Sequence, residues 1–325
     1  MRRLWPWLRL LLAAGVLVAL GWRLGTGAFT DGLRAIDARS VLAALGIGLL
    51  TTVFSAWRWC VVARGLGLRL PLRTAVADYY RGLLLNAVLP AGVLGDVHRA
   101  VHHGQRSGDV GRGVRAVVFE RGAGQVVLVA VGVVVLLAHP ELLPTLVTGG
   151  GVLLAAAAVL LVAVLGLAVL GRGRVPALRR ALLTTGADAR RGLLSRDTLP
   201  PVVLLSAATV AGHVALFLVA ARTAGSSAPL GTLVPLVVLA LLVMALPVNV
   251  GGWGPREAFL AVAFGAVGLG AAQGLTTGVV YGVLATIAGL PGVLVLFRRR
   301  LPAQDREVLP ERLDQRREQL LPLAG

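Results

Sequence analysis

Long apolar stretches, interrupted by short arginine-rich segments, dominate the pattern along this chain. A transmembrane helix needs about 20 predominantly apolar residues, and several stretches approach that length. The pattern predicts an all-α, polytopic membrane helix bundle of about six to eight spans. The predicted spans are residues 8–22, 41–59, 115–138, 145–170, 200–221, 230–246, 257–269 and 275–297.

The arginines predict the orientation of these spans. Loops rich in basic residues stay on the cytoplasmic side of a membrane. Arginine clusters occur near the N-terminus, directly after 41–59, in the 172–196 loop and at 298–300, whereas the loops at 139–144 and 221–229 are poor in arginine. Both termini are therefore expected in the cytoplasm, with a membrane domain at 1–300 and a short mixed-charge tail at 301–325.

Residues 74–95 are long enough to cross the membrane but do not fit this orientation. If they crossed, the arginine cluster at 172–196 would lie on the opposite side. We therefore expect this segment to enter the membrane and return. Irregular backbone at membrane depth is tolerated only where it is buried in protein or lines water, so a re-entrant segment implies a lined cavity.

Two similar breaks interrupt apolar segments. Residues 89–100 read LPAGVLGDVHRA and residues 246–257 read LPVNVGGWGPRE, and in each an arginine follows the proline by nine positions. Matching Pro/Gly breaks in two parts of a transporter point to a binding site, because broken helix ends direct N–H groups into a cavity. Arg99 and Arg256 would add positive charge suited to phosphate. Ordinary loops between helices are the alternative interpretation.

Four acidic residues lie in or beside apolar segments, where an ionised side chain is costly unless it is paired. Helical i, i+3 spacing predicts local ion pairs between Asp78 and Arg81 and between Asp96 and Arg99. Glu120 and Glu257 are each adjacent to an arginine that should not face them, so they are expected to find partners on other segments, with Arg99 or Arg81 the candidates. These charges can also be purely structural ion pairs.

Tyrosines and histidines add weaker candidates. Tyr79 and Tyr80 are interpreted as part of the interfacial aromatic belt rather than a cavity lining. His98 and His102 share a helix face, but no acidic partner completes a metal motif. His213 lies inside a predicted span and is expected to hydrogen-bond between helices. We expect neither a metal nor another cofactor.

Composition narrows the class of protein. Hydrophobic residues make up 57% and charged residues 14% of the 325 positions, too few charges to cover a soluble globule. The net charge of +17 comes from arginine alone, since the chain has no lysine. Because the arginines alternate with apolar runs, no basic domain for nucleic acid forms. The absence of lysine also excludes a P-loop ATPase motif.

Three motifs together give the chain a family resemblance. YYRGLLLNAVLPAGVLGDVHRA at 79–100, FERGAG at 119–124 and LPVNVGGWGPREAFL at 246–260 follow one another in order. This order resembles the lysylphosphatidylglycerol synthase transmembrane-domain family, a flippase-like membrane domain. Leu94 stands where the family has a first glycine before Gly-Asp, and Pro255 precedes the second motif arginine. The resemblance covers about residues 5–300 and rests on Asn86, Pro90, Gly95, Asp96, Arg99, Glu120, Arg121, Gly254, Arg256 and Glu257.

The resemblance implies a bacterial inner-membrane protein that binds and translocates a phospholipid or a lipid-linked headgroup. No aminoacyltransferase domain follows the last predicted span, so we expect no synthase activity. The alternatives are a membrane-embedded transferase and a non-transporting partner of a separate lipid-modifying transferase or synthase. The candidate ligand-binding residues are Arg99, Arg256, Asp96, Glu257, Glu120, Arg121, Asn86 and Arg81, and the residues expected to shape the breaks are Pro90, Gly95, Pro247, Gly251, Gly252 and Gly254.

Overall fold

The structure is a computed structural model that describes residues 27–88, 94–144, 176–245 and 253–297. Within these ranges the chain is helical apart from its short connections, which confirms the all-α prediction. The predicted spans at 8–22 and 145–170 and the tail at 301–325 lie outside the described residues. The helices are α2 (Gly27–Ala35), α3 (Ala38–Gly65), α4 (Leu72–Val88), α5 (Leu94–Arg106), α6 (Val110–Ala138), η1 (Pro140–Leu142), α8 (Pro176–Gly192), α9 (Leu199–Thr223), α10 (Leu230–Met244), α11 (Pro255–Ala266), α12 (Ala271–Gly289) and α13 (Pro291–Phe297).

Four helical stretches of the described chain are long and apolar enough to cross a membrane, as expected of a membrane protein. They are α3, α6, α9 and the 25-residue stretch Ala271–Val295 that joins α12 to α13. Asp37 begins α3 by accepting a hydrogen bond from the Ser40 backbone N–H at 2.8 Å, and this bond lowers the pKa of the Asp37 carboxyl. Such a cap pairs one of the N–H groups that a helix start leaves free.

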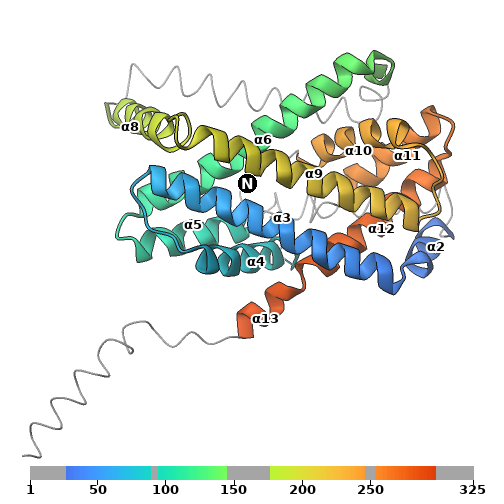
Figure 1. Ribbon diagram of the computed structural model, residues 1–325, viewed down its shortest axis with the longest axis horizontal. Coiled ribbons are helices and arrows are strands. Elements are labelled where there is room, and N and C mark those ends of the chain that lie inside the picture. The colour runs from blue at the N-terminus through green and yellow to red at the C-terminus, as the bar shows by residue number, and fades with distance from the viewer. Residues whose placement is uncertain (1–26, 89–93, 145–175, 246–252, 298–325) are drawn as a thin grey trace, which may run out of the picture.

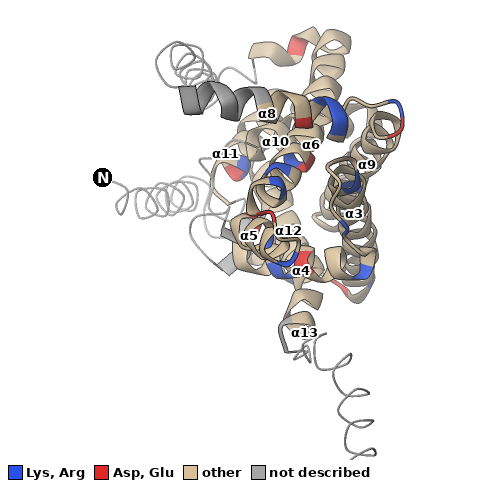
Figure 2. Ribbon diagram, turned by 90° about the vertical axis from the view of Figure 1, so that its left-hand side faces the viewer, with Lys and Arg blue, Asp and Glu red and all other residues tan. Residues whose placement is uncertain are grey.

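The bundle is organised around α3 and α9, which lie side by side along the long axis of the molecule (Figure 1). One apolar core joins α9, α10, α11 and α12 through residues such as Phe217, Leu236 and Phe264. A second joins α3, α4, α5 and α6 through residues such as Trp59 and Phe119. Figure 2 shows that basic and acidic residues lie on helices inside the bundle as well as at its periphery.

Helices α4 and α5 are antiparallel, as expected if residues 74–95 enter the membrane and return. Near the start of α4, Asp78 Oδ2 lies 3.5 Å from Arg106 Nη1 at the end of α5. Near the break, the Gly95 N–H donates to Asn86 Oδ1 at 2.8 Å. Asn86 thus ties the two helices together across residues 89–93, a structural role beside the ligand-binding role expected for it.

Helices on both sides of the second break are also short. At 1.5 Å per residue, α10, with 15 residues, is about 22 Å long and α11, with 12 residues, about 18 Å. Both are shorter than the hydrocarbon core of about 30 Å, so the predictions of 230–246 and 257–269 as complete spans are corrected. Gly254 begins α11 at φ 99°, a conformation that favours glycine, and Pro255 occupies the first helical position, where proline is well tolerated.

Close packing of α5 on α4 depends on Gly95, and replacing it with Ala tests this contact. A Cβ atom there would lie 2.1 Å from the Gly82 carbonyl oxygen, so we expect G95A to lower the free energy of unfolding by about 1–3 kcal/mol. Gly122→Ala is the matched control, because its Cβ would meet nothing within 4 Å. Thermal unfolding in detergent measures both variants; equal stability of the two would contradict the proposed close approach.

Candidate functional site

Glu120 of α6 is the centre of a buried cluster of charged side chains. Its Oε1 accepts hydrogen bonds from Arg58 Nε of α3 at 3.0 Å and from Tyr79 Oη of α4 at 2.9 Å. Its Oε2 accepts from Arg99 Nη2 of α5 at 2.8 Å. Glu120 is fully buried and Arg99 is 1% exposed. Four helices therefore meet at one carboxylate, and the predicted pairing of Glu120 with Arg99 is confirmed.

Asp96 of α5 extends this cluster to Arg121 of α6. Its Oδ1 accepts from Arg99 Nε at 2.9 Å, which confirms the predicted local pair. Its Oδ2 accepts from Arg121 Nε at 2.8 Å. The Arg121 side chain is 47% exposed, in contrast to the other arginines of the group. We call the six residues the Glu120 cluster: Arg58, Tyr79, Asp96, Arg99, Glu120 and Arg121.

The Glu120 cluster has an excess of positive charge. Its three arginines face two carboxylates, and Arg99 Nη1 is buried with no hydrogen-bond partner in the described chain. The Arg99 guanidinium lies over the rings of Tyr79, at 4.1 Å, and Trp59, at 4.9 Å. Such cation–π contacts partly offset the loss of water around a buried cation. The two carboxylates therefore leave one positive charge of the cluster unbalanced.

The second motif forms a separate cluster at the start of α11. Arg256 Nε donates to Glu257 Oε1 at 3.0 Å, and the Gly254 N–H donates to Glu257 Oε2 at 2.7 Å. The expectation that Glu257 pairs across segments was therefore wrong. The Arg256 guanidinium lies over the Trp253 ring at 5.2 Å and the Tyr281 ring at 5.0 Å. We call this group the Glu257 cluster: Trp253, Gly254, Arg256, Glu257 and Tyr281.

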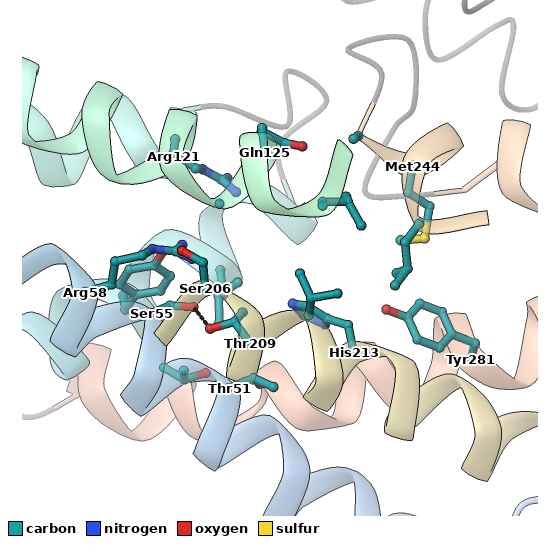
Figure 3. A pocket seen from close by; sticks show the side chains of 18 residues that line it. Thr51, Ser55, Arg58, Arg121, Gln125, Ser206, Thr209, His213, Met244 and Tyr281 are labelled. Atoms are coloured by element: carbon teal, nitrogen blue, oxygen red, sulfur yellow. Dashed lines mark hydrogen bonds between the residues drawn. The ribbon is translucent and has the colours of Figure 1, made fainter. Parts of the chain in front are cut away.

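A cavity of about 260 Å³ lies between α3, α4, α6, α9, α10 and α12. In Figure 3, Arg58 and Arg121 lie towards one end, Tyr281 and Met244 towards the other, and His213 between them. Tyr79 and Tyr281 connect the cavity to the two clusters, because each lines the cavity and also carries a motif arginine over its ring. We call this space the central cavity.

Hydroxyl groups of α3 and α9 line the central cavity beside its arginines. Ser55 and Thr209 lie 3.4 Å apart across the helix interface (Figure 3). Arg58 Nη1 donates to Ser206 Oγ at 3.1 Å. The remaining lining is largely apolar and includes Leu128, Leu241 and Met244. A cavity that combines cations, hydroxyls and an apolar wall matches the chemistry of a lipid with a polar headgroup.

The candidate residues take up different places relative to this cavity. Arg121 lines it, whereas Arg99 and Arg256 lie behind Tyr79 and Tyr281. Arg81 lies elsewhere, bonded to Asp78 Oδ1 at 3.0 Å, as predicted, and to the Val295 carbonyl at 3.4 Å. Pro90, Pro247, Gly251 and Gly252 lie outside the described residues.

Three aromatic and basic side chains were missed or misassigned. Arg58 is absent from the predicted site residues, yet it is 5% exposed, bonds to Glu120 and lines the cavity. Tyr79 and Tyr80 are 9% and 3% exposed, so the interpretation as a surface aromatic belt is corrected. A signal was present for Arg58, because it lies within a span where a cation needs a partner.

The histidines form no metal centre in the described part of the chain, where no group of three potential ligands comes together. His98 and His102 share a helix face, as predicted, and their rings stack with centroids 5.5 Å apart. His213 lines the central cavity, and its expected hydrogen bond between helices stays a prediction.

Comparison with known proteins gives one match. A family model described as "Lysylphosphatidylglycerol synthase TM region" matches residues 7–292. Neither the curated proteins nor the solved structures gave a significant match. The matched region contains all three motifs on which the resemblance rests, from Asn86 to Glu257.

Proposed function

This chain belongs to the lysylphosphatidylglycerol synthase TM region family, and we propose that it binds the headgroup of a phosphate-containing membrane lipid in the central cavity and carries it across the membrane. One observation supports this most: Arg58 and Arg121 line a cavity inside a bundle of apolar helices, together with hydroxyls and apolar side chains. Arginine guanidinium groups hold phosphate by charge-assisted hydrogen bonds.

The roles of the motif arginines follow from their places in the two clusters. Arg121 contacts the phosphate, because its side chain lines the cavity and is 47% exposed while Asp96 holds it. Arg99 and Arg256 act as positioning residues, since each lies behind a cavity-lining tyrosine. The short helices on both sides of the breaks resemble the discontinuous helices that form substrate sites in transporters.

The proposed setting is the bacterial cytoplasmic membrane, with both termini in the cytoplasm. The distribution of arginines supports this orientation. Transport would be passive or coupled to an ion gradient. A second candidate function is a non-transporting partner of a lipid-modifying transferase, which the word "synthase" in the family description favours.

Reconstitution distinguishes these functions. Purified protein is placed in liposomes containing headgroup-labelled phosphatidylglycerol, and an impermeant reagent quenches the label on the outer leaflet. We expect the protected inner-leaflet signal to decay faster than in protein-free liposomes. Binding of the labelled lipid without faster decay would support the partner function. Absence of both binding and decay, with folded protein, would contradict the proposal.

A further inference from the structure

The central cavity is lined by cations but by no carboxylate within the described chain. Arg58 and Arg121 face it, while the residues around them are neutral. The two carboxylates of the Glu120 cluster are turned towards the arginines: Glu120 is fully buried, and Asp96 is 16% exposed and bonded to Arg99 and Arg121. The charged side chains that face a ligand in the cavity are therefore positive.

The sequence extends this asymmetry to the two breaks. Residues 89–93 and 246–252, which adjoin α4, α5, α10 and α11, contain neither aspartate nor glutamate. The segments 1–26 and 145–175 contain none either, so outside the described ranges acidic residues occur only in 298–325. No acidic residue in the breaks can therefore compensate for the two cavity arginines.

The aromatic side chains at the cavity offer little to an ammonium group. Recognition of ammonium by aromatic rings requires free ring faces. The Arg99 guanidinium already covers Tyr79 at 4.1 Å. Tyr281 has the Arg256 guanidinium at 5.0 Å and stacks on Phe217 with ring centroids 3.9 Å apart. Each of these rings thus already holds a guanidinium group of the protein itself.

Neutral hydrogen-bonding groups complete the lining. Ser55, Ser206 and Thr209 provide hydroxyls, and Gln125 provides an amide near Arg121 (Figure 3). Hydroxyls and amides both donate and accept hydrogen bonds, so they match the hydroxyl groups of a glycerol or sugar. The polar end of the cavity therefore resembles a site for a phosphate ester of a polyol.

We propose that the central cavity selects anionic, hydroxyl-bearing phosphodiester headgroups and excludes aminoacylated, cationic headgroups. This selectivity rests on the proposed function. A lysyl ester of phosphatidylglycerol carries more ammonium groups than phosphates, so its headgroup has a net positive charge. Placed beside Arg58 and Arg121, its ammonium groups would lose water and find no anion, and unpaired like charges are an effective means of rejecting a ligand.

A competition experiment with the full chain in nanodiscs of neutral lipid tests this selectivity. Bound headgroup-labelled phosphatidylglycerol is displaced by unlabelled phosphatidylglycerol, lysylphosphatidylglycerol, phosphatidylethanolamine or water-soluble glycerol 3-phosphate. We expect lysylphosphatidylglycerol to need at least about tenfold higher concentration than phosphatidylglycerol. Phosphatidylethanolamine should be intermediate, because its ammonium group is balanced by its phosphate.

Gln125→Glu is a variant that we expect to weaken the selectivity. It adds a carboxylate of nearly the same shape to the cavity lining, so we expect the preference for phosphatidylglycerol over lysylphosphatidylglycerol to fall about tenfold. Gln105→Glu is the matched control, since Gln105 is exposed on α5 away from the cavity. The control should leave the preference unchanged.

The outcomes separate this selectivity from the proposed function. Equal or tighter binding of lysylphosphatidylglycerol, with phosphatidylglycerol also bound, would overturn the selectivity and leave lipid binding intact. If glycerol 3-phosphate competes as well as the intact lipid, the ligand is a soluble phosphate ester, and the lipid assignment fails. If nothing competes and no lipid binds, both proposals are wrong.

Discussion

Replacing Glu120 with Gln is expected to destabilise the bundle more than any other conservative change, by about 3–5 kcal/mol. The glutamine keeps the shape of the side chain but removes its negative charge. Arg58 and Arg99, which are 5% and 1% exposed, would then share a buried site without the carboxylate that pairs them. Removing one partner of a buried ion pair leaves an uncompensated charge, which dominates the loss.

Glu141→Gln is the matched control for this substitution. Glu141 makes its contact with His139 at the surface, where its side chain is 66% exposed. Exposed ion pairs contribute little, so this variant should unfold at the wild-type temperature. Thermal unfolding of both variants in detergent, with the yield of folded monodisperse protein, provides the measurement. A Glu120→Gln protein as stable as the control would show that the Glu120 cluster is not structural.

Replacing Arg121 with Gln is expected to have the largest effect on lipid binding. The Arg121 side chain lines the cavity and is 47% exposed, and its partner Asp96 keeps a second bond to Arg99. Its removal should therefore change the stability little. Hydrogen bonds to charged groups contribute about 1.5–3 kcal/mol, so we expect affinity for labelled phosphatidylglycerol to fall about 10–100-fold.

Arg112→Gln removes an arginine of the same helix without touching the cavity. The Arg112 side chain is 48% exposed and pairs with Asp109 at 3.4 Å. Both variants lose one positive charge, so a difference between them reports the position of Arg121 rather than net charge. Titration of each variant with labelled lipid, and the rate of label loss in liposomes, measure the effect. Equal affinities of the two variants for the labelled lipid would show that Arg121 does not contact it.

Local features of the fold and site could be predicted because they depend on helix geometry. The pairs Asp78–Arg81 and Asp96–Arg99 follow from i, i+3 spacing and are present at 3.0 and 2.9 Å. The expectation that Glu120 pairs with Arg99 or Arg81 followed from the high cost of an unpaired charge in a membrane, and the partner in the structure is Arg99. These inferences need no knowledge of how the helices pack.

Contacts between distant segments could not be predicted from local spacing. Arg58 bonds to Glu120, which is 62 residues away in the sequence, and to Ser206, which is 148 residues away. No periodic pattern in a sequence indicates contacts over such separations. The prediction that Glu257 pairs with another segment was wrong for a different reason. In the first turn of α11 its side chain turns back to the Gly254 N–H, which brings it within reach of the adjacent Arg256, although neighbours within a helix normally point apart.

The position of Arg58 has a consequence for the order in which the protein assembles. Arg58 lies in the C-terminal part of α3 (Ala38–Gly65), and an unpaired cation in a membrane helix is costly, by about 2.5–3.5 kcal/mol at the helix centre and less towards its ends. Its partner, 62 residues later, leaves a ribosome about 3–12 s afterwards at 5–20 residues per second. Until α6 is synthesised, Arg58 of α3 lacks its partner Glu120. We therefore expect α3 to take up its final position in the membrane only after α6 has been inserted.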